Sequence, residues 1–159
     1  MIVAAYLLSI VAANLLISKL GASWTPVVGF FAIGLDLTLR DKLHERWSGR
    51  RLLLKMAALI AVGGVATVIL SSGSLAVAVA SLLAFTAASS VDAGVYHALR
   101  GSGKPRARYV SNIFGAAADS MVFPFMAFGA WMPAVSLLQF AAKAAGGAMW
   151  AWVLNMRER

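Results

Sequence analysis

Four ionisable side chains stand inside long apolar runs of this sequence, where a charge is costly to keep. Asp36, Asp92 and Asp119 each interrupt an apolar stretch, and Lys143 interrupts another near the C-terminal end. A charge at the centre of a bilayer costs roughly 2.5–3.5 kcal/mol on translocon-type scales, so such residues usually face a bundle interior or a watery cavity. These four residues therefore predict either a polar binding site inside a membrane or structural ion pairs between helices.

Their neighbours at helical spacing favour a binding site. Residues three, four and seven apart share a helix face, and Asp92, Asp119 and Lys143 have polar, small or aromatic residues at those distances. The stripes are Asn112, Gly115, Asp119 and Phe123; Ser89, Asp92 and Tyr96; Gln139, Lys143, Gly147 and Trp150; and Asn14 with Ser18. If they converge on one interior, they supply donors, acceptors and rings, which is the composition of a small-molecule site.

The elements that must position these residues are membrane-spanning helices. Of 159 residues, 61% are hydrophobic and 13% are charged, the mean hydropathy is +0.82, and the apolar residues form long blocks. A helix needs about 20 such residues to cross a hydrocarbon core, where its backbone must satisfy its own hydrogen bonds. We expect an all-α membrane protein of six helices, over residues 2–20, 24–39, 52–70, 75–99, 109–130 and 134–154.

No segment is long enough for a soluble domain, so residues 1–159 are expected to form a single membrane domain. No basic region precedes the first apolar run, and we therefore expect a retained helix in place of a signal peptide.

The basic residues predict the orientation of the chain. The net charge is +8, and 12 of the 14 Lys and Arg residues fall within residues 40–55, residues 100–108 and the C-terminal end. With six spans these three places lie on one side of the membrane, which the positive-inside rule makes cytoplasmic. We therefore expect both termini in the cytoplasm, and basic residues that contact anionic lipid and no nucleic acid.

Several chemistries lack the residues that they need. The sequence has no cysteine, and its two histidines, His44 and His97, are too few and too far apart for a metal site. It has no phosphate-binding loop of the Walker type and no Ser/His/Asp constellation. We predict no catalytic residue, no metal and no cofactor, and expect a protein that is not an enzyme and does not hydrolyse ATP itself.

Four stretches resemble the VUT family of vitamin uptake transporters, which includes bacterial transporters of queuosine precursors. They are "AANLLISKLG", "FFAIGLDLTLRDKL", "VDAGVYHALR" and "RYVSNIFGAAADSMVFPFMAF". The last two are the most distinctive, and Lys143 matches a lysine in the family's last helix. The resemblance implies six helices and uptake of 7-cyano-7-deazaguanine (preQ0) or a related deazapurine across the bacterial cytoplasmic membrane. The motif positions expected to bind substrate are Asn14, Asp36, Asp92, Tyr96, Asn112, Asp119 and Lys143, and Arg40 also stands at one.

Within that expectation, Asp119 is predicted to accept hydrogen bonds from the N–H and exocyclic amine of a guanine-like ring. Asn112 would contact another ring position, and Lys143 would either pair with Asp119 or donate to the ring carbonyl.

The main alternative is a substrate-binding subunit energised by a separate ATPase module, like the small S-components of energy-coupling-factor transporters. In that case the small residues Ala5, Ser9 and Ala13 could form a docking face for the module. Either a homo-oligomer or such a coupling module would then be the protein partner.

Overall fold

The protein is a bundle of long helices. The computed structural model describes residues 1–47, 51–99, 101 and 103–156, and contains no strand among them. The uninterrupted helices are α1 (Ile2–Leu20), α4 (Leu52–Leu70), α5 (Leu75–Leu99), α6 (Lys104–Phe128) and α7 (Pro133–Met156), and a short 3₁₀ turn, η3 (Ser72–Ser74), precedes α5. The predicted all-α fold is confirmed, and the predicted bounds of α1, α4 and α5 agree with the structure.

The second membrane helix is assembled from four consecutive segments. They are the 3₁₀ turn η1 (Ala22–Trp24), α2 (Thr25–Val28), the π-helical η2 (Gly29–Ile33) and α3 (Gly34–Arg46). A π-helical turn often marks a functional position in a helix, and here it ends three residues before Asp36. The carbonyl of Phe31, inside this turn, accepts a hydrogen bond from Trp150 Nε1 of α7 at 2.8 Å.

Two helices extend beyond their predicted membrane spans at the polar side of the bundle. The apolar segments Ala22–Arg40 and Val110–Phe128 agree with the predicted spans, but the second helix continues to Arg46 and α6 begins at Lys104. Hydropathy marks where a helix leaves the hydrocarbon, whereas the backbone hydrogen bonds continue through charged residues into the interface.

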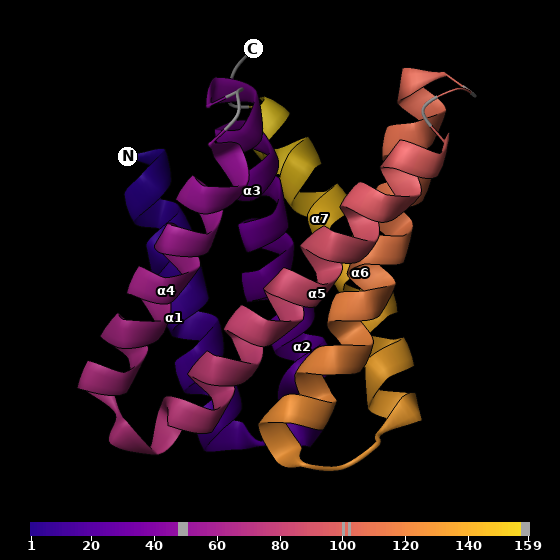
Figure 1. Ribbon diagram of the computed structural model, residues 1–159. Helices are drawn as coiled ribbons and strands as arrows, with labels where there is room; N and C mark the ends of the chain where they lie inside the picture. The colour runs from indigo at the N-terminus through magenta and orange to yellow at the C-terminus, as the bar shows by residue number, and fades with distance from the viewer. Residues whose placement is uncertain (48–50, 100, 102, 157–159) are drawn as a thin grey trace.

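The helices run alternately up and down, so that four parts of the chain lie at the same end of the bundle. The start of α1, the end of α7, the end of α3 with the start of α4, and the joined ends of α5 and α6 all lie at that end (Figure 1). Helices α5 and α6 pair closely, α1 packs against α4 and α3, and α7 packs against η2 and α3.

This shared end carries basic residues of the predicted clusters, including Lys42, Arg46, Arg51, Lys55 and Arg106. Four others, Arg50, Arg100, Arg157 and Arg159, lie outside the described residues. That this end faces the cytoplasm stays a prediction.

The outer surface is suited to lipid. Among the described residues, four segments are long and apolar enough to cross a membrane, namely Ile2–Leu20, Ala22–Arg40, Ser72–Leu99 and Val110–Phe128, and Leu54–Leu70 is a shorter apolar helix. Large apolar side chains such as Leu8, Ile69 and Leu137 are exposed on it. In water such a surface would drive association, so its natural solvent is the bilayer.

Small residues bring the second membrane helix and α7 together. A Cβ added to Gly34 would lie 2.6 Å from the carbonyl carbon of Gly146, and a Cβ added to Gly146 would overlap the carbonyl oxygen of Phe30. The two backbones therefore touch, as small residues permit between membrane helices. This contact fixes how far α7 is shifted along its axis relative to Asp36.

Two apolar clusters close the bundle at different heights. One holds Ala13, Ile17, Val28, Val77, Ala80, Ala84 and Phe123. The other holds Tyr6, Ile10, Leu39, Leu43, Met56 and Ile60, nearer the end with the chain termini. The charged residues of the interior lie in the region that these clusters bound.

Candidate functional site

A cavity of about 170 Å³ lies at the centre of the bundle, and every membrane helix contributes to its wall. Its polar lining residues are Ser9, Asn14, Asp36, Arg40, Ser81, Ser89, Asp92, Asn112, Asp119 and Lys143, and its aromatic ones are Tyr6, Phe85 and Phe123. A cavity of about 150 Å³ is enough to bind benzene. The volume and the mixed lining therefore suit a small, flat ligand with several polar groups.

The Asp119–Lys143 ion pair joins α6 to α7 at the wall of this cavity. Lys143 Nζ donates to Asp119 Oδ2, and the lysine side chain is almost wholly buried while that of Asp119 is 28% exposed. Of the two roles predicted for Lys143, this structure shows the pairing. Each charge offsets the desolvation of the other, and the open side of the carboxylate faces the cavity.

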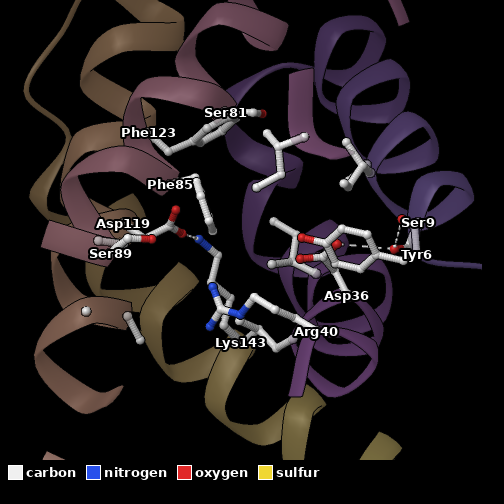
Figure 2. Close-up of a pocket in the computed structure, with 18 of the residues that line it drawn as sticks. Tyr6, Ser9, Asp36, Arg40, Ser81, Phe85, Ser89, Asp119, Phe123 and Lys143 are labelled. Atoms are coloured by element: carbon white, nitrogen blue, oxygen red, sulfur yellow. Dashed lines mark hydrogen bonds and ion pairs between the residues drawn. The ribbon is translucent and has the colours of Figure 1, made fainter. Parts of the chain in front are cut away.

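Asp36 forms a second polar group across the cavity. The Ser9 hydroxyl lies 3.3 Å from Asp36 Oδ1 and 2.7 Å from the backbone oxygen of Tyr6. Figure 2 shows Asp36, Ser9 and Tyr6 on one side of the view, and Asp119, Ser89, Phe85 and Phe123 on the other.

Asp36 lines the cavity together with Arg40, Asp119 and Lys143. Arg40 lies one helical turn beyond Asp36, and its Nε is buried without a hydrogen-bond partner. The cavity therefore contains two opposed groups of acid and base, which is the arrangement expected where a polar ligand is held inside a membrane.

Asn14 lines the cavity, but its amide is engaged in holding helices together. Its Nδ2 donates to Thr67 Oγ1 of α4 at 3.5 Å, and its Oδ1 accepts from Ser81 Oγ of α5 at 2.6 Å. Both ends of the amide are thus occupied, so Asn14 connects α1, α4 and α5 at the cavity wall.

The remaining predicted residues divide between the cavity and its surroundings. Asp92 and Asn112 line the cavity, and Asp92 Oδ1 is buried without a hydrogen-bond partner. Tyr96 does not line it and is exposed. The cause is geometric, because the ends of α5 and α6 stand away from α3 and α7 in Figure 1.

Two features of the site differ from the sequence analysis. Ser9 and Ala13 are buried and line the cavity, so the docking face suggested for Ala5, Ser9 and Ala13 points inward at two of its three positions. Sequence reasoning also missed Tyr6, Ser9, Ser81 and Phe85 as site residues. Phe85 stands four residues before Ser89 of the Asp92 stripe, and Ser81 stands four residues before Phe85. Extending that stripe by two turns toward the start of α5 would therefore have found both.

The comparison with known proteins gives one family. The sequence model of the family described as "putative vitamin uptake transporter" matches residues 2–156. This match covers every helix and every cavity-lining residue named above. No curated protein and no solved structure gives a significant match.

Proposed function

This chain belongs to the vitamin uptake transporter family, and on that premise we propose that it carries a queuosine precursor into the cell. The proposed substrate is 7-cyano-7-deazaguanine (preQ0) or a related deazapurine. A multi-pass protein of the bacterial cytoplasmic membrane with a cavity at its centre is suited to moving a small solute.

One observation carries the proposal, namely the ion-paired carboxylate of Asp119 facing a cavity with aromatic walls. A guanine-like ring presents an N–H and an exocyclic amine side by side, and a carboxylate offers two acceptor oxygens at matching spacing. Phe85 and Phe123 line the same cavity and supply apolar faces for a flat ring. The ion pair with Lys143 holds the Asp119 side chain in place at the cavity wall.

The other site residues complete a binding role. Asn112, on the face of α6 that carries Asp119, would contact a second position of the ring. Asp36 and Arg40 provide an acceptor and a donor on the opposite wall. Asn14 would hold the wall in place, because its own amide is already hydrogen-bonded. Tyr96 lies outside the cavity, and the proposed site does not include it.

Competition uptake in cells that cannot make queuosine tests the substrate. The chain is expressed alone, and uptake of labelled preQ0 is measured with unlabelled 7-cyano-7-deazaguanine, 7-aminomethyl-7-deazaguanine (preQ1), queuine, guanine or adenine in excess. We expect deazapurines to compete and plain purines to compete weakly. Labelled uptake that guanine suppresses as well as preQ0 does contradicts the proposal. So does the absence of uptake above the empty vector for both labelled preQ0 and labelled preQ1, with and without a co-expressed coupling module.

The same assay separates a self-sufficient carrier from a subunit of a larger transporter. We expect uptake in a host that lacks energy-coupling ATPase modules. If uptake appears only when such a module is co-expressed, the chain is the substrate-binding subunit of a coupled transporter.

A further inference from the structure

The acidic and basic side chains that line the cavity are unequal in number. Among the described lining residues there are three carboxylates, Asp36, Asp92 and Asp119, and two basic side chains, Arg40 and Lys143. With all five ionised, one negative charge remains. An uncompensated charge inside a membrane protein is costly, and such charges are usually matched by a partner or by a ligand.

The three carboxylates differ in the partners that compensate them. Asp119 is paired with Lys143. Asp36 is within hydrogen-bond distance of Ser9, and Arg40 stands one helical turn from it in the same cavity lining. Asp92 has neither form of compensation, because its Oδ1 is buried without a hydrogen-bond partner and no ion pair joins it to a basic side chain in the described part of the chain.

We propose that Asp92 binds a protonated amine on the substrate, so that the cavity selects an amine-bearing deazapurine over a neutral one. This inference rests on the proposed function, and it names the member of the substrate class. An aliphatic amine is protonated at neutral pH, and its charge and N–H groups would compensate the buried Asp92 oxygen. A nitrile has no charge and no N–H to offer, so it would leave Asp92 uncompensated.

The packing of α5 against α6 places Asp92 suitably for this role. A Cβ added to Gly115 would lie 3.2 Å from Asp92 Cβ, so the two residues are in contact. Asp119 is four residues beyond Gly115 on α6, which is a rise of about 6 Å. A bicyclic ring that presents its guanine edge to Asp119 can therefore extend a 7-aminomethyl arm toward Asp92.

Binding of two matched ligands to purified protein tests the inference. The ligands are 7-aminomethyl-7-deazaguanine and 7-cyano-7-deazaguanine, and the proteins are the parent, Asp92→Asn and Asp92→Glu. The parent should bind the amine at least tenfold more tightly than the nitrile, as the loss of a charged hydrogen bond implies. Asp92→Asn should remove that preference while its affinity for the nitrile stays within about twofold, and Asp92→Glu should keep the preference.

The controls separate the possible failures. Ser90→Ala is the matched control, because Ser90 is exposed and its hydroxyl donates to Thr86 O of its own helix. Retained nitrile binding shows that Asp92→Asn is folded. Equal affinity of the parent for both ligands, or an equal loss of both in Asp92→Asn, overturns the inference and leaves the proposed function intact. If the parent binds neither deazapurine, both fail.

Discussion

At the scale of single residues, the buried Asp119–Lys143 pair combines two roles that substitutions can separate. Its structural role is mutual compensation of charge between α6 and α7. Its proposed binding role uses the face of Asp119 that remains open to the cavity. If Asp119 has only the structural role, removing both charges together should leave ligand affinity unchanged. If Asp119 also binds the substrate, affinity should fall even when both charges are removed.

We predict that Asp119→Asn lowers affinity for a deazapurine at least tenfold, because an amide donor then faces a ligand donor and Lys143 loses its partner. Removing one member of a buried pair also destabilises the fold, typically by about 3–5 kcal/mol. The double variant Asp119→Asn/Lys143→Gln should recover much of that stability without recovering affinity. Thermal unfolding in detergent and equilibrium binding measure the two effects separately.

If the double variant binds the ligand as tightly as the parent does, Asp119 is a structural residue and the binding role is wrong. A second informative result would be unchanged stability in Asp119→Asn, which would show that the pair is weak in the folded protein.

At the scale of elements, the contact between the second membrane helix and α7 determines the shape of the cavity. Gly34 and Gly146 allow the backbones to touch, and the neighbouring π-helical turn offers the Phe31 carbonyl to Trp150. Thr38 adds a hydrogen bond from its hydroxyl to the carbonyl oxygen of Gly147 at 3.2 Å. These contacts position Asp36 and Lys143, which lie on the two helices just beside them.

We predict that Gly146→Ala destabilises the protein by about 1–3 kcal/mol or more, because the new methyl overlaps the Phe30 carbonyl and the helices must separate. Gly147→Ala is the matched control, since nothing lies within 4 Å of a Cβ added there. Alanine also favours a helix over glycine, so the control should be neutral or slightly stabilising. The measurement is the midpoint of thermal unfolding in detergent, and equal midpoints for the two variants would refute this account of the contact.

At the scale of the whole molecule, alternating helices bring the basic residues to one end of the bundle. The ends of α3 and α7 and the joined ends of α5 and α6 lie there (Figure 1), and the connection at Ser72 lies at the other. By the positive-inside rule we expect the basic end to face the cytoplasm.

We predict that a reporter fused at Gly103 reads as cytoplasmic and that one fused at Ser72 reads as external. A paired test uses alkaline phosphatase, which is active outside, and a fluorescent protein that matures inside. An external reading at Gly103 would reverse the orientation, and the same reading at both positions would contradict the crossing by α5.

The sequence by itself determined the features that depend on local chemistry. The bounds of α1, α4 and α5 follow from apolar runs of membrane length ended by polar or glycine-containing connections. The depth of Asp119 and Lys143 follows from their place within such runs, and the helical stripes identified most of the polar cavity wall.

Only the tertiary structure decided which of these residues meet. Spacing orders residues on one helix face but does not say how far each helix is rotated or shifted against its neighbours, because that depends on backbone contacts such as those at Gly34, Gly115 and Gly146. Those contacts pair Lys143 with Asp119, leave Asp92 Oδ1 without a hydrogen-bond partner among the described residues, and place Tyr96 outside the cavity. The π-helical turn that shifts the face of the second helix just before Asp36 likewise depends on packing against α7, and no local pattern in the sequence predicts it.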